Sequence, residues 1–167
     1  MQEIYLLTGT NLGIKPDNLS RAKSYINRLV GPIHRESSIY ETAAWGFENQ
    51  ENFLNQALML KSEIFPEKLL VLLKKIEQTM GRAGTVKWGP RAIDIDILFV
   101  GNSVIETENL CVPHRNLQRR NFALIPLTEI APELFHPVLK KTVTQLLMKC
   151  GDENWVKIFE PNPVNWK

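Results

Sequence analysis

At residues 87–98 the chain reads Lys87-Trp88-Gly89-Pro90-Arg91-Ala92-Ile93-Asp94-Ile95-Asp96-Ile97-Leu98. A glycine-proline turn comes first, and an apolar strand with carboxylates on alternate residues follows it. Side chains on a strand alternate between its faces, so Asp94 and Asp96 point the same way, with Cα atoms roughly 6.6 Å apart. Carboxylates at that spacing repel each other, and a cation between them relieves the repulsion. The pattern therefore indicates a hard-metal site, with Arg91 beside it for an anionic ligand.

A second interpretation of Asp94 and Asp96 is a solvated charge pattern that only discourages edge-to-edge strand pairing. Aspartate is disfavoured in strands, however, so two of them in a run of Ile, Leu and Val need a reason. The preceding turn and Arg91 favour chemistry, because carboxylates, a hard metal and arginine are the groups used in phosphoryl transfer.

Length and composition are those of an ordinary globular protein. The chain has 167 residues, 44% hydrophobic and 23% charged, and a net charge of +2, too small for a nucleic-acid-binding surface. Cys111 and Cys150 suggest reduced thiols rather than a disulfide framework. There is no signal-peptide pattern after Met1, and the aliphatic run 69–73 is too short to span a bilayer. We expect a single cytoplasmic domain over residues 1–167, with no nucleic-acid or membrane partner.

Hydrophobic periodicity predicts strands near residues 4–7, 33–42 and 52–62, and a fourth that carries Asp94 and Asp96 and ends at the Gly101-Asn102 turn. Helices are predicted from a cap at Asp17 to Gly31, and from Pro66 to Gly81. The order β-α-β-β-α-β is typical of the ferredoxin-like α/β (α+β) sandwich. Additional C-terminal elements are expected, as strands near 104–107, 110–112 and 155–159 and helical runs at 117–130 and 142–148. Pro126 predicts a break inside the first of these runs.

Besides residues 87–98, five blocks of the chain form a recognisable set. In chain order they are Thr8-Gly9-Thr10-Asn11-Leu12, Glu51-Asn52-Phe53-Leu54-Asn55-Gln56, Val112-Pro113-His114, Arg119-Arg120-Asn121-Phe122 and Ile130-Ala131-Pro132-Glu133-Leu134. Together they resemble the 6-hydroxymethyl-7,8-dihydropterin pyrophosphokinase family of folate biosynthesis. Its signature, a basic residue, any residue, Gly-Pro-Arg, two variable positions, Asp-aliphatic-Asp and two aliphatics, matches residues 87–98 throughout.

The resemblance implies an Mg²⁺-dependent enzyme that transfers pyrophosphate from ATP to the hydroxymethyl group of 6-hydroxymethyl-7,8-dihydropterin, leaving AMP. It implies two Mg²⁺ ions held by Asp94 and Asp96, which form the catalytic set with Arg82 and Arg91. The ATP-binding residues that it implies are Glu77, Arg82, Arg91, Ile97, His114 and Arg120. The pterin-binding residues that it implies are Thr42, Ala43, Trp45, Phe53, Asn55, Trp88 and Phe122. We expect a monomer whose partners are ATP and the pterin.

The residue types suit these roles, although several have ordinary explanations as well. Phe53 and Asn55 share a strand face, and the carboxamide matches the donors and acceptor of a pyrimidinone edge. Taken alone, Phe53 and Phe122 also fit core packing, and His114 a surface loop. Arg115 stands where many family members carry an aromatic residue, which leaves its nucleotide contact open. A role for Asp96 as proton acceptor also stays open.

Two other classes share the predicted topology. An RNA-binding domain needs exposed aromatics and a basic face on the central strands, where this chain places aspartates. A non-catalytic small-molecule sensor has no need of two aspartates and three arginines. The sequence contains no P-loop, zinc-ligand spacing or Gly-x-Ser-x-Gly elbow. We also expect the segment from Gly81 to Pro90 to close over the bound substrates.

Overall fold

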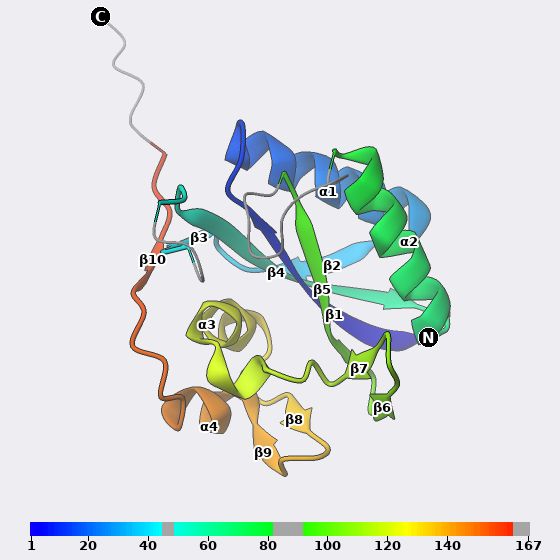
Figure 1. Ribbon diagram of the computed structural model, residues 1–167. Helices are drawn as coiled ribbons and strands as arrows, with labels where there is room; N and C mark the ends of the chain where they lie inside the picture. The colour runs from blue at the N-terminus through cyan, green and yellow to red at the C-terminus, as the bar shows by residue number, and fades with distance from the viewer. Residues whose placement is uncertain (45–48, 82–91, 162–167) are drawn as a thin grey trace, which may run out of the picture.

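A computed structural model describes residues 1–44, 49–81 and 92–161 of the chain. Its central element is an antiparallel sheet in the order β10-β3-β4-β1-β5, with β2 also paired to β4. The strands are β1 (Gln2–Thr10), β2 (Ile33–Glu36), β3 (Tyr40–Thr42), β4 (Phe53–Ser62), β5 (Asp94–Val100) and β10 (Val156–Ile158). The long strands β1 and β4 form its middle, as Figure 1 shows.

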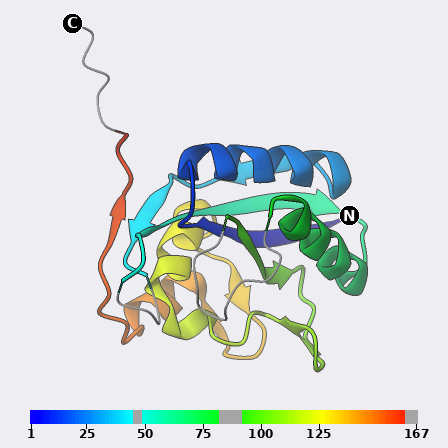
Figure 2. The ribbon, with the colours of Figure 1, turned by 45° about the horizontal axis from the view of Figure 1, so that its top comes forward.

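Helices α1 (Lys15–Leu29) and α2 (Pro66–Thr79) cover one face of the sheet, as seen in Figures 1 and 2. Their apolar stripes pack on the even-numbered residues of β1 and β4. The buried residues of this layer include Ile4, Leu6, Leu19, Ile26, Leu58, Leu60, Leu69, Leu73 and Ile76. The strands and both helices thus confirm the ferredoxin-like β-α-β-β-α-β order.

The opposite face is covered by α3 (Asn121–Ile130) and α4 (Val143–Met148). These helices pack on the odd-numbered side chains of β1 and β4, among them Tyr5, Leu7, Ala57 and Met59. The remaining short elements are η1 (Leu117–Arg119) and two ribbons, β6 (Ile105–Glu106) with β7 (Cys111–Val112) and β8 (Phe135–His136) with β9 (Lys141–Thr142). The β8–β9 ribbon was not anticipated from the sequence, because neither strand is longer than two residues.

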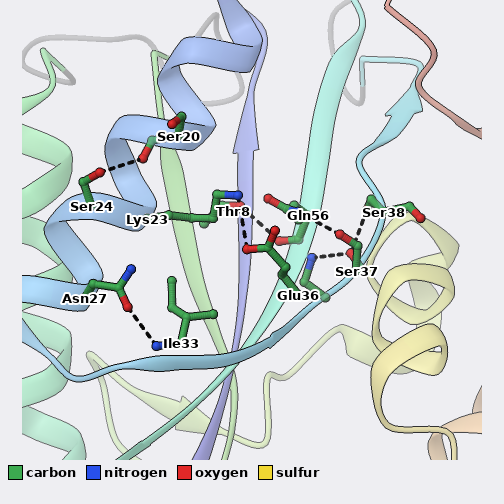
Figure 3. A network of polar contacts seen from close by, with 11 residues as sticks. Thr8, Ser20, Lys23, Ser24, Asn27, Ile33, Glu36, Ser37, Ser38 and Gln56 are labelled. Carbon is green, nitrogen blue, oxygen red and sulfur yellow. Dashed lines mark hydrogen bonds and ion pairs between the residues drawn. The ribbon is translucent and has the colours of Figure 1, made fainter.

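The strand expected over residues 33–42 is interrupted between β2 and β3. Ser37 lies in this bend, where its amide donates to the Ala57 carbonyl at 2.9 Å and its Oγ accepts from the Ala57 amide at 2.9 Å. Gln56 Nε2 donates to the Ser37 carbonyl at 2.7 Å, as Figure 3 shows. A side-chain hydroxyl therefore takes the place of one ladder carbonyl, and the strand turns at this point.

Two helix predictions were wrong in detail. Helix α3 runs through Pro126, and the break lies before it, at Arg120, whose backbone is extended (φ −127°, ψ 97°). Pro126 forfeits only one helical hydrogen bond, and burial of its ring offsets that loss. Asp17 does not cap α1, which begins after Ile14, but lies in the first turn, where its charge suits the helix dipole.

The part of the chain that the structure describes contains no helix both long and apolar enough to cross a membrane.

Substitutions on α2 test the packing of the helical layer. Leu69 is fully buried in the core, so Leu69→Ala should lower the free energy of unfolding by about 2–5 kcal/mol. Val71 on the same helix is 66% exposed, and Val71→Ala should change it by less than about 0.5 kcal/mol. Urea unfolding of both variants measures the difference, and equal losses would contradict the layer assignment.

Candidate active site

The register of β1 with its two neighbours aligns three polar positions. Gly9 of β1 lies opposite Asn55 of β4 on one side and opposite Asp94 of β5 on the other. Leu7 lies opposite Ala57 and Asp96 in the same way. Because paired residues share a face, Asn55 and Asp94 stand on the face that carries α3, separated by one glycine. The structure therefore brings two segments expected to bind different substrates into one row.

The glycine in this row allows the close approach of Asn55. A Cβ at Gly9 would lie 2.7 Å from Asn55 Oδ1, which is shorter than any ordinary contact. The Asn55 carboxamide is held from the other side, because its Nδ2 donates to Thr42 Oγ1 at 3.0 Å. Phe53 pairs with Thr42 in the register and lies half-buried on the same face. Three residues expected at the pterin thus lie together.

The carboxylates on β5 are in an unfavourable setting without a cation. The pKa of Asp96 is raised to about 7, first by burial and then by the charges of Asp94 and Glu77, against the opposing effect of Arg120 and Lys74. A carboxyl group that resists ionisation beside another carboxylate fits a divalent cation, which would remove that cost. Among residues 1–44, 49–81 and 92–161, no group of three or more His, Cys, Asp or Glu side chains could hold a metal.

His114 and Arg120 lie within electrostatic reach of these carboxylates. The pKa of His114 is lowered to about 4, first by burial and then by the charge of Arg120, against an opposing effect from Asp94. The neutral imidazole accepts from the Asn116 amide at Nδ1, 3.2 Å away, which leaves Nε2 to carry the proton. The Arg120 guanidinium carbon lies 5.6 Å from the centroid of the Phe122 ring. Arg120 thus links the predicted nucleotide residues to a predicted pterin residue.

Two of the expected ATP-binding residues lie away from the face of the sheet that carries Asn55 and Asp94. Glu77 on α2 is buried, and its Oε1 accepts from the Ile95 amide at 2.8 Å while Oε2 accepts from Lys74 Nζ at 3.3 Å. This carboxylate supports the outer edge of β5 and so the position of Asp94 and Asp96. The Ile97 side chain is buried between β5 and the α1–α2 layer, so any ligand contact by Ile97 falls to its main chain.

The remaining predicted positions are spread more widely. Ala43 follows directly on Thr42 at the end of β3. Trp45, Arg82, Trp88 and Arg91, with the segment expected to close over the site, lie outside the described residues. Arg115, whose role the sequence left open, lies 3.8 Å from Glu106 in an exposed ion pair.

Sequence reasoning missed what Gly9, Tyr40 and Glu129 contribute. Gly9 stood in a quoted block, but only the register shows that it separates Asn55 from Asp94. Tyr40 lies opposite Asn55, and its hydroxyl donates to Glu129 on α3 at 2.6 Å. No local pattern joins residues 89 positions apart, so no sequence signal pointed to this contact.

Comparison with known proteins gives consistent matches. Residues 5–132 match the family model described as 7,8-dihydro-6-hydroxymethylpterin-pyrophosphokinase (HPPK). The chain is 42% identical over 159 residues to a 2-amino-4-hydroxy-6-hydroxymethyldihydropteridine pyrophosphokinase of Aquifex aeolicus, covering 95% of this chain and 96% of that protein. It is 40% identical over 131 residues to the Bacillus subtilis protein of the same name, covering 78% of each.

Among solved structures, an HPPK-DHPS triple mutant of Plasmodium falciparum aligns with a TM-score of 0.72 and 20% sequence identity. The alignment covers 89% of this chain and 41% of that one, so this chain spans less than half of the solved protein. At that identity the likeness supports the fold alone.

The burial of Asp96 predicts a pH-dependent cost in the metal-free protein. The pKa is raised in the folded state, so stability falls as pH rises from the unfolded value near 4 towards about 7, and is then constant. Asp96→Asn cannot ionise, so its gain in unfolding free energy over wild type should be larger at pH 8 than at pH 5. Urea unfolding with EDTA at both pH values measures this gain.

Glu153→Gln, at an exposed carboxylate, is the matched control and should show the same difference at both pH values. A gain from Asp96→Asn that shrinks with rising pH would mean that burial does not penalise the Asp96 carboxylate.

Proposed function

The chain belongs to the 7,8-dihydro-6-hydroxymethylpterin pyrophosphokinase family and transfers pyrophosphate from ATP to the pterin hydroxymethyl group in folate biosynthesis, and we propose that it does so across the row Asn55, Gly9 and Asp94. The observation that carries this assignment is the register of β1, which sets Gly9 opposite both polar residues. Adjacent strands are about 4.8 Å apart, so Asn55 and Asp94 are separated by about 10 Å. That span suits a pterin ring at one end and a phosphate chain at the other.

The pterin ring binds at the Asn55 end of the row. Phe53 on β4 and Phe122 on α3 form its aromatic walls, and Asn55, oriented by Thr42, reads its polar edge. Ala43, Trp45 and Trp88 complete this slot. The hydroxymethyl group then points along the row past Gly9 towards Asp94, and the glycine is needed because a side chain there would displace Asn55.

The polyphosphate lies at the Asp94 end of the row. Asp94 and Asp96 hold two Mg²⁺ ions there, and the raised pKa of Asp96 in the metal-free site supports the need for a cation. Bound Mg²⁺ supplies charge neutralisation for the phosphates and the attacking oxygen. Arg82, Arg91 and Arg120 provide fixed positive charge to the phosphate oxygens, which is the main protein contribution to such a transfer.

The rest of the nucleotide binds alongside β5. His114, kept neutral by burial and Arg120, offers Nε2–H as a donor rather than a second positive charge. The Ile97 main chain contacts ATP from β5. Glu77 acts on ATP indirectly, because it holds the edge of the strand that carries the metal ligands.

We propose that the protein is a monomer that acts in the cytoplasm and forms one domain over residues 1–167. Its proposed partners are ATP and the pterin, and we propose that it binds neither nucleic acid nor a membrane. Ordinary composition and a net charge of +2 support this assignment.

Removal of either metal carboxylate should abolish most turnover without unfolding the protein. Asp94→Ala and Asp96→Ala should each lower kcat by at least about 100-fold, the scale of losing a preorganised electrostatic contact. Stability should be kept, since each change relieves a repulsion. Steady-state assays at saturating Mg²⁺ with parallel thermal melts measure both. Near-normal turnover in either variant, or activity of wild type in excess EDTA, would refute the assignment of the metal ligands.

Asn55→Leu should weaken the binding of the pterin without weakening the binding of ATP. Leucine has a similar size but leaves the polar pterin edge unpaired, so the pterin Kd should rise on the order of 10- to 100-fold. The Kd of an ATP analogue should change little. Calorimetry with each ligand measures this, with Gln78→Leu at an exposed position of α2 as the control. Equal losses for both ligands would make Asn55 a structural residue instead.

A further inference from the structure

The two proposed walls of the pterin slot belong to different parts of the chain. Phe53 and Asn55 lie on β4, whereas Phe122 lies in the first turn of α3, more than sixty residues later. No covalent connection fixes the width of the slot between them. Non-covalent contacts between α3 and the sheet must therefore set it.

Besides the apolar packing of α3, one carboxylate near the end of this helix makes several hydrogen bonds to the strand side of the slot. Glu129 accepts from the Ser38 amide at 3.1 Å by both oxygens, and from Ser38 Oγ at 2.9 Å. Its Oε2 also accepts from the Tyr40 hydroxyl at 2.6 Å. Hydrogen bonds to an ionised acceptor are short and strong, and three donors on β3 and the bend before it converge on this one.

The charge state of Glu129 agrees with that arrangement. Partial burial acts to raise the pKa of Glu129, but the hydrogen bonds from Tyr40 and Ser38 outweigh it and the pKa is lowered. Burial, and then the hydrogen bond to Glu129, raise the pKa of Tyr40 to about 12. At neutral pH the pair is thus a carboxylate and a neutral phenol.

The segment that is hydrogen-bonded to Glu129, which contains Ser38 and Tyr40, is itself bonded to β4 next to Asn55. Ser37 exchanges hydrogen bonds with Ala57, and its carbonyl accepts from Gln56 Nε2, as Figure 3 shows for Ser37 and Gln56. Tyr40 lies opposite Asn55 in the register, and both are buried. The path from Glu129 to Asn55 consists of short polar contacts and one strand pair, so it has little freedom.

The two ends of α3 are held independently. At its first turn, the Asn121 amide donates to Asp152 Oδ2 at 3.1 Å, and Asn121 Nδ2 donates to the Asn154 carbonyl at 2.6 Å. At its last turn, Arg35 Nη1 donates to the Ile130 carbonyl at 2.9 Å beside the Glu129 contacts. Loss of Glu129 would therefore leave the start of α3, and Phe122 with it, in place, and would release Ser38 and Tyr40 from the helix.

We propose that Glu129 is a positioning residue for the pterin, which holds Ser38 and Tyr40 in place and so fixes β3 and its partner Asn55 relative to Phe122 on α3. This inference rests on the proposed pterin slot. It concerns affinity for one substrate, because Arg120 lies at the start of α3, which the contacts with Asp152 and Asn154 hold without Glu129, whereas Asn55 pairs with the strand that Glu129 contacts.

The test compares Glu129→Ala, Glu129→Gln and Tyr40→Phe by direct pterin binding, by the KM for each substrate and by kcat. Glu129→Ala should raise the pterin Kd and KM about tenfold, as expected for a small misplacement of a binding wall. The KM for ATP and the kcat at saturating pterin should stay within about twofold. Glu129→Gln keeps an acceptor for Tyr40 and should rescue most of the affinity.

Tyr40→Phe should reproduce part of the loss, and combining it with Glu129→Ala should add little, because both remove one contact. Glu133→Gln is the matched control: it removes an exposed carboxylate four residues away and should leave all constants unchanged. Thermal melts of each variant identify a loss of folded protein, which would lower the apparent kcat and leave both KM values unchanged.

Asn55→Leu, assayed alongside, separates two kinds of failure. If Asn55→Leu does not weaken the binding of the pterin, the slot itself is misassigned. Asn55→Leu could weaken the binding of the pterin while Glu129→Ala only lowers the melting temperature or raises both KM values. In that case the assignment of the slot is correct and the positioning role of Glu129 is wrong.

Discussion

The antiparallel register of β1 is the constraint on which the site depends. Because Gly9 faces Asn55 on one neighbour and Asp94 on the other, one row of the sheet carries a polar carboxamide, a glycine and a carboxylate. A slip of one residue in either pairing would turn these side chains to the face covered by α1 and α2. The tight packing of Ile4, Leu6, Leu58 and Leu60 on that face resists such a slip. The hydrophobic core therefore holds the chemistry in register.

The two faces of the sheet have divided roles. One is apolar along its length and is closed by α1 and α2. On the other, α3 and α4 cover the apolar residues Tyr5, Leu7 and Met59, while Asn55, Gly9 and Asp94 follow at the strand ends. Helix α3 is shared by both parts, since its buried side stabilises the core and its first turn carries Phe122 beside Arg120. Attachment of this helix is thus a matter of function as well as stability.

The carboxylates on β5 show that the site is not optimised for the stability of the empty protein. Burial and neighbouring negative charge disfavour ionised Asp96, and Glu77 adds to that cost while it supports the strand edge. A protein selected for stability alone would place apolar residues there. Such a cost is reasonable where a cation and a charged substrate remove it during the reaction.

Local pattern was enough to predict the element order, the shared face of Asp94 and Asp96, and that of Phe53 and Asn55. These features depend on strand alternation and helix periodicity, which are properties of neighbouring residues. The ferredoxin-like order followed from them, and the residue types identified a hard-metal, phosphate-binding chemistry. Local pattern failed at Ser37 and Pro126, where a hydroxyl bonded to β4 and a buried ring overrode propensity.

The tertiary structure alone decided which of these residues meet. Only the folded chain contains the row Asn55–Gly9–Asp94 and the raised pKa of Asp96. The same holds for the contact of Arg120 with the Phe122 ring and for the hydrogen bonds that Glu129 accepts from Ser38 and Tyr40. Most of them join segments dozens of residues apart, and long-range pairing, burial and helix docking set them together. A linear pattern does not encode register or burial across such separations, so the site is a property of the folded sheet.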